Sequence, residues 1–182
     1  MENIMADTGH LILTAVGPDQ IGLVEKISQF IAAHGCNIED SKMAVFCGEF
    51  AVIILITGES GKLIRVANAY HDLEIQTGLT ISLKTPSIRQ STDSFLPYVL
   101  TASCMDHPGI VHRLSQLLSR HGVNIESMET KTHAAPVSGT PIFRLEALLS
   151  IPTKANISSL RAQFSDIQRE ENIDIELTAT KR

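Results

Sequence analysis

The strongest constraint on the fold is an internal repeat that relates the two halves of the chain. Shifting the 182-residue sequence by 87 positions superimposes Leu13–Ala15 on Leu100–Ala102 and, without a gap, Asn37–Glu39 on Asn124–Glu126. About half of the aligned positions between Leu13 and Glu39 are identical. Two copies are too few for a solenoid, and a copy of about 85 residues is large enough for a small domain. The repeat therefore predicts two tandem domains.

The joint between the copies is expected in a polar stretch near Thr85–Ser94. This stretch is rich in residues that favour turns, and its proline disfavours the continuation of a strand. We therefore predict a first domain over residues 1–86, a linker over 87–95 and a second domain over 96–182.

Hydrophobic spacing and turn residues indicate the same order of elements in both copies. A short β-rich run comes first, followed by an apolar series at helical spacing that ends at His-Gly. Two further runs suggest a β-hairpin, and an amphipathic helix and an alternating strand close the copy. The predicted ranges are 10–16, 21–31, 36–45, 49–57, 61–76 and 79–83 in the first copy, and 98–103, 110–118, 123–133, 141–150, 154–170 and 173–177 in the second.

The order βαββαβ, repeated twice, predicts an α+β protein with two ferredoxin-like domains. Each domain is expected to have a four-stranded antiparallel sheet with both helices on one face. The other face and the sheet edges would remain uncovered, so we expect the two copies to pack together or the chain to form a homodimer. The second copy has a longer hairpin connection, residues 134–140, whose role the sequence does not indicate.

The composition argues against nucleic acid and membranes as direct partners. The net charge is −5, and the chain has no cluster of Lys and Arg that would bind phosphates. The topology is shared with RNA-binding domains, but the hairpin strands carry only Phe46, Phe50 and Phe143 as stacking aromatics. The longest apolar run, residues 50–56, is too short to span a bilayer, and we expect no secretory leader.

The cysteines indicate a reducing compartment. Cys36, Cys47 and Cys104 are odd in number and form no C-x-x-C pair, so we expect free thiols and a cytoplasmic protein. Cys104 with His107 and His112 could suggest a zinc site, but the first copy lacks all three residues and a fourth ligand is missing. A nucleophilic pair of Cys104 with His107 or His133 would lack an orienting group. We predict no metal, no cofactor and no catalytic residue.

A D-x-x-G motif stands between the first strand and the first helix of each copy, at Asp19–Gly22 and Asp106–Gly109. Glycine lets the backbone approach a ligand closely, and a helix N-terminus offers unpaired N–H groups to a carboxylate. These properties suit a small amino acid. Alternatively, the aspartates cap their helices and the glycines only permit tight packing. For Asn37 and Asn124 a turn role is favoured over ligand contact, because asparagine tolerates left-handed backbone.

The second copy resembles an ACT domain through the run Asp106–Val111 and the later run Gly122–Ile125. The first copy keeps the acid, the glycine and the asparagine of this signature but has Ile21 in place of the usual proline. The tandem arrangement over the whole chain resembles the glycine cleavage system transcriptional repressor family.

This resemblance implies a stand-alone pair of ACT domains that responds to glycine and acts through a DNA-binding transcriptional activator protein. Enzymes with similar modules, such as formyltetrahydrofolate deformylases, carry a separate catalytic domain. A ligand-free adaptor and a regulatory subunit of an enzyme remain as alternatives. The expected ligand-binding residues are Gly17, Asp19, Gln20, Ile21, Gly22, Asn37 and Ile38 in the first copy, and Asp106, His107, Pro108, Gly109, Asn124 and Ile125 in the second.

Overall fold

The computed structural model describes residues 8–87 and 94–180. The chain divides into two compact units, one on each side of the Arg89–Gln90 bond, and each unit has its own hydrophobic core. Residues 88–93 of the predicted linker lie outside the described residues, and Phe95 already belongs to the first strand of the second unit. No helix in the described ranges has the length and apolar character needed to cross a membrane.

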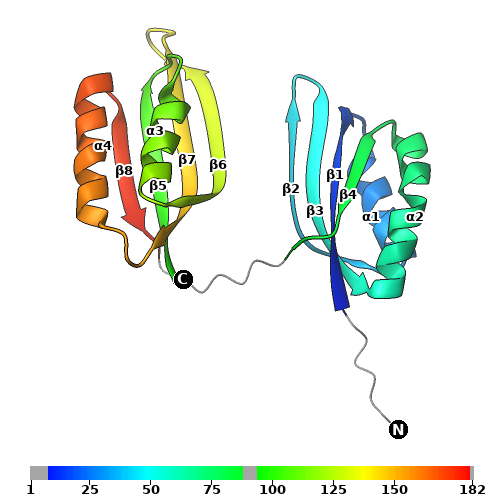
Figure 1. Ribbon diagram of the computed structural model, residues 1–182. Coiled ribbons are helices and arrows are strands. Elements are labelled where there is room, and N and C mark those ends of the chain that lie inside the picture. Colours follow the sequence, from blue (N-terminus) through cyan, green and yellow to red (C-terminus); the bar gives the residue numbers. More distant parts are fainter. Residues whose placement is uncertain (1–7, 88–93, 181–182) are drawn as a thin grey trace. The chain divides into compact units, whose positions relative to one another are not determined.

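The first unit is a four-stranded antiparallel sheet with two helices on one face (Figure 1). The strand order is β2-β3-β1-β4, so β2 and β4 are the edge strands. The elements are β1 (Thr8–Pro18), α1 (Leu23–Ala33), β2 (Asn37–Phe46), β3 (Glu49–Glu59), α2 (Ser60–Thr77) and β4 (Thr80–Lys84).

The second unit repeats this topology with the order β6-β7-β5-β8 (Figure 1). Both units therefore have the βαββαβ order and the ferredoxin-like α+β fold that the sequence predicts. The elements are β5 (Phe95–Met105), α3 (Ile110–Arg120), β6 (Asn124–Ala134), β7 (Pro141–Pro152), α4 (Ile157–Glu171) and β8 (Asp174–Ala179).

The core of each unit lies between the sheet and its two helices. Alternate residues of a strand point to the same face, and in β1 the buried set is Leu11, Leu13 and Ala15. In α1 the residues that meet them, Leu23 and Ile27 among others, recur at helical spacing. Full burial of one such aliphatic side chain contributes about 1.5–3 kcal/mol, so these positions hold the helices on the sheet.

The hairpin strands carry a β-bulge at the same place in both units. Pairing shifts between Ile38 and Asp40 against β3, and between Ile125 and Ser127 against β7. The turn of the first hairpin is tight, because Cys47 and Gly48 both have positive φ, at 51° and 84°. Two consecutive residues with positive φ match the right-handed twist of the strands that they join. The second hairpin is closed instead by the longer connection between Ala134 and Pro141.

Candidate functional site

In the first unit, the D-x-x-G loop connects the end of β1 to α1 and is held by two other parts of the fold. The backbone N–H of Asp19 donates a hydrogen bond to the carbonyl of Gly48 in the hairpin turn at 2.8 Å. Lys26 in α1 extends its Nζ to the carbonyl of Gln76 at 3.3 Å, near the C-terminal end of α2. A cation is favourable at that end of a helix because the last carbonyl groups are unpaired. The loop thus lies between the hairpin turn and α2.

The equivalent loop of the second unit has the same supports and one more. The backbone N–H of Asp106 donates to the carbonyl of Pro141 at 2.9 Å. In addition, the hydroxyl of Thr132 in β6 donates to Oδ2 of Asp106 at 3.3 Å. The long hairpin connection that ends at Pro141 therefore borders the loop, which gives this segment a position next to the candidate site.

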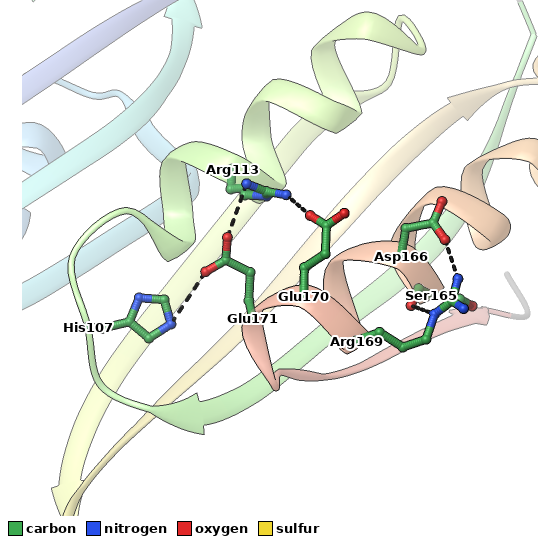
Figure 2. A network of polar contacts seen from close by, with 7 residues as sticks. All are labelled: His107, Arg113, Ser165, Asp166, Arg169, Glu170 and Glu171. Atoms are coloured by element: carbon green, nitrogen blue, oxygen red, sulfur yellow. Dashed lines mark hydrogen bonds and ion pairs between the residues drawn. The ribbon is translucent and has the colours of Figure 1, made fainter.

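Figure 2 shows a network of charged side chains that joins the second loop to α4. His107 Nε2 lies 3.9 Å from Oε2 of Glu171, and Arg113 Nη1 lies 3.1 Å from Oε1 of the same carboxylate. Arg113 also pairs with Glu170. These side chains are partly exposed, so each ion pair contributes at most about 1 kcal/mol. The network connects the loop to α4 more than it stabilises the unit. The same view contains a separate contact of Arg169 with Asp166 and Ser165 within α4.

Glycine at the end of each loop is required by the backbone conformation. Gly22 and Gly109 are the N-cap residues of α1 and α3, with φ of 92° and 101°. A Cβ atom placed on either residue would meet nothing within 4 Å, so the alternative that these glycines only permit tight packing is wrong. Only glycine adopts this left-handed region without strain.

The alternative in which Asp19 and Asp106 cap the helices is wrong. Neither helix N-terminus receives a hydrogen bond from a described side chain, because the N-cap position is occupied by glycine. The first-turn N–H groups therefore have no side-chain acceptor, and the exposed aspartate stands three residues before each N-cap. Such a helix end attracts an anionic group, while a carboxylate nearby suits a cation.

The structure brings only part of the expected site together. Gly17, Asp19, Gln20, Ile21 and Gly22 form one group at the end of β1, and Asp106, His107, Pro108 and Gly109 form its counterpart after β5. Gln20, Ile21 and Pro108 are exposed, and His107 is partly exposed.

The remaining residues, Asn37 and Ile38 with Asn124 and Ile125, lie at the opposite end of each sheet. Asn37 pairs with Thr57 of β3, whereas the loop adjoins the other end of β3 near Glu49. The eight steps between Thr57 and Glu49 correspond to about 26 Å. Ile38 and Ile125 pack against the cores.

The turn role predicted for the two asparagines is also wrong. In the described part of the chain, the only residues other than glycine with positive φ are Cys47 and Asn172, and the left-handed residues before β2 and β6 are Gly35 and Gly122. Asn124 donates instead from Nδ2 to Glu126 at 2.6 Å. It also borders, with Ile125, a groove of about 730 Å³ between α3 and β6.

Three residues that support the second loop were not predicted: Arg113, Thr132 and Glu171. A signal existed for Arg113, because the 87-residue repeat aligns it with Lys26 and both cations reach the C-terminal end of the second helix of their unit. Thr132 and Glu171 have no such signal, since they come from the hairpin and from the far end of α4.

Burial limits the reactivity of Cys104. Cys104 is buried, and burial, with the nearby charges of Asp106 and Glu171, raises the pKa of its thiol. A raised pKa disfavours the thiolate that attacks substrates or binds metals. Among residues 8–87 and 94–180, no group of three or more His, Cys, Asp or Glu side chains is arranged to hold a metal ion.

Comparisons with known proteins identify both units. Residues 9–84 and residues 98–153 each match an ACT domain family. The glycine cleavage system transcriptional repressor of Escherichia coli strain K12 is 24% identical over 163 residues, which cover 90% of this chain and 86% of that protein.

Two solved structures match this chain over most of its length. An unknown protein from Galdieria sulphuraria is 30% identical, with a TM-score of 0.81 over 96% of this chain and 100% of that one. A candidate glycine cleavage system transcriptional repressor is 23% identical, with a TM-score of 0.70 over 97% of this chain and 99% of that one.

Proposed function

Because the chain belongs to the ACT domain family, with one ACT domain in each unit, we propose that it is an amino-acid-responsive regulator of transcription. The proposed ligand is glycine, and the proposed partner is a DNA-binding protein that activates glycine cleavage genes. The proposed compartment is the cytoplasm. The E. coli relative that covers 90% of the chain is named as a repressor of the glycine cleavage system, and this name supports the proposal.

The observation that carries the proposal is the paired D-x-x-G loop. In both units a helix begins at a left-handed glycine without a side-chain cap, and an exposed aspartate precedes it by three residues. An amino acid carries the two complementary groups, since its carboxylate suits the helix N-terminus and its ammonium group suits the aspartate. The loops are also tied to the hairpins by backbone hydrogen bonds, so a bound ligand can influence the surface around them.

Regulation requires that the ligand bind one state of the protein better than another. The helices that follow the loops, α1 and α3, contact the C-terminal ends of α2 and α4 through Lys26 and Arg113, and these contacts are exposed and weak. A ligand that draws the helix N-terminus toward itself would compete with them. We propose that this competition alters the surface that the activator contacts.

The ligand is tested by thermal denaturation of the full chain with glycine, serine and alanine. At a hundredfold excess over the dissociation constant, a ligand adds about 2.7 kcal/mol to the free energy of unfolding. N-acetylglycine and glycinamide are the matched probes, because the first lacks the ammonium charge and the second lacks the carboxylate. Stabilisation by glycine but by neither probe is expected.

Variants then locate the ligand. Asp19→Asn and Asp106→Asn remove one loop charge each, and each should abolish or halve the thermal stabilisation by glycine. Asp72→Asn is the control, at an exposed position of α2, and should leave this stabilisation unchanged. If no amino acid stabilises the chain, the sensor proposal fails and a ligand-free adaptor remains. If glycine binds but does not change the affinity for the purified activator, the regulatory part fails.

A further inference from the structure

The open face of the second sheet carries a pattern of charges that the fold itself does not need. This face lies opposite α3 and α4, and the strand pairing arranges its residues in rows that run across β6, β7 and β5. One row is acidic at Glu129 and Glu146, and the next is basic at Lys131 and Arg144. Thr101 and Ser103 of β5 continue the two rows. A hollow of about 930 Å³ is lined by both rows.

The charges in each row repel each other. Glu129 pairs directly with Glu146 across the strands, and Lys131 pairs directly with Arg144. Like charges in directly opposite positions destabilise a sheet. Among the described residues none of these four side chains has an ion pair or a hydrogen bond, so each is available to pair with another molecule.

Apolar residues flank the two charged rows. Leu148 and Val99 lie beyond the acidic row, and Ile142 and Met105 lie beyond the basic row. Leu148 and Met105 are exposed, by 39% and 60%. Along β7 the order is therefore apolar, acidic, basic, apolar. In β6 the outer rows carry Ser127 and His133, and in β5 the inner rows carry the uncharged Thr101 and Ser103.

This order is complementary to itself. A two-fold axis placed between the charged rows and parallel to them sets each residue of one face over its counterpart in another copy. Glu129 then faces Lys131 of the second copy, and Glu146 faces its Arg144. By the same rotation the outer apolar rows face each other. Because this axis is perpendicular to the strands, each strand runs nearly antiparallel to its counterpart in the other copy, within the range of aligned sheet packing.

We propose that the chain forms a homodimer in which the open faces of the two β6-β7-β5 surfaces pack together. The hollow over the charged rows provides space for the long Lys131 and Arg144 side chains of the facing copy. The β8 column is the exception, because Glu176 would face Asp174, so the contact is centred on β7. The inference is independent of ligand binding at the loops.

The first unit lacks this pattern and supplies the control. At the positions that correspond in register to Glu129 and Glu146 it has Lys42 and Ile53, and at those of Lys131 and Arg144 it has Ala44 and Ala51. The described open face of the first unit therefore has no acidic row and no basic row at these positions. A charge reversal at Lys42 should therefore leave the dimer unchanged.

The test uses two full-length variants and light scattering after size-exclusion chromatography. Wild type should have twice the chain mass of 19.8 kDa. Glu129→Lys with Glu146→Lys makes both rows basic, and Lys131→Glu with Arg144→Glu makes both rows acidic. Each variant alone should raise the dimer dissociation constant about tenfold or more, because like charges then face each other. An equimolar mixture of the two should form a heterodimer.

Thermal denaturation of each variant verifies folding, and Lys42→Glu is the control that should stay dimeric. Higher salt should weaken the wild-type dimer, since exposed charges are screened. The proposal is overturned if wild type is a monomer at high micromolar concentration and low salt, which would leave the hollow to another occupant. It is equally overturned if both charge variants remain dimers, or if their mixture does not associate.

Discussion

Replacing Gly22 with alanine should destabilise the first unit through the backbone alone. Gly22 has φ of 92°, and an added Cβ would meet nothing within 4 Å. An L-residue in the left-handed region loses about 1–2 kcal/mol, and the lower entropy of the unfolded chain returns about 0.4–1 kcal/mol. The expected net loss is about 1 kcal/mol. In a unit of this size, that corresponds to a decrease in Tm of about 4–8 °C.

Gly61 in the same unit is the matched control. It lies in the first turn of α2, its φ is not positive, and an added Cβ would also meet nothing within 4 Å. Alanine at this position should therefore raise the free energy of unfolding by about 0.5–1 kcal/mol.

Urea denaturation of the full chain measures the two changes, and hydrogen exchange with mass spectrometry assigns them to the first unit. Opposite signs for Gly22→Ala and Gly61→Ala are the expected result. If Gly22→Ala is as stable as wild type, the left-handed N-cap is not what requires glycine at this position, and the loop geometry derived from it is wrong.

Two further predictions concern pH and packing in the first unit. The backbone N–H of Ile81 and the side chain of His71 both bond the Glu74 carboxylate and lower its pKa below the ordinary value of 4.5. Because the folded-state pKa is the lower one, this contribution is present above pH 4.5 and is lost as the pH falls through the folded-state pKa. Glu74→Gln should flatten that part of the stability profile measured by denaturation between pH 3 and 6, and an unchanged profile would count against the two hydrogen bonds. Separately, a Cβ at Gly58 would lie 2.8 Å from Sγ of Cys36, so Gly58→Ala should destabilise the unit and Cys36→Ala should relieve most of that loss. Additive effects in this double-mutant cycle would contradict the clash.

The fold could be predicted because the repeat and the change of hydrophobic period are strong in both copies. The ends of the strands are harder to predict from the sequence. The sequence predicts that the first strand stops at Val16, since Gly17-Pro18 is a turn signal, yet both residues pair with β3. Gly17 pairs with Phe50, and a side chain at Gly17 would meet Leu79 at 3.1 Å. These partners are distant in sequence, so no local window contains the information.

The candidate site was predicted in part for a geometric reason. The D-x-x-G motif marks a strand-to-helix loop, and the structure places it there in both units. The prediction groups the asparagines with this motif because they belong to the later run of the sequence that resembles the ACT signature. However, α1 has 11 residues and carries the chain back by about 16 Å, so β2 starts at the other end of the sheet. Asn37 is therefore close to the loop in sequence but distant from it in space.

The two units show which positions the fold constrains and which it leaves free. Inward positions of the strands are apolar in both units, because these side chains form the cores. A shift of the strand pairing by one residue would turn the whole apolar set toward solvent. Outward positions carry no such constraint, and there Ile53 and Ala51 of one unit correspond to Glu146 and Arg144 of the other. Folding cannot account for this difference, since the sheets are the same. The proposed dimer gives a reason for the charged face of the second unit, which the shared fold does not require.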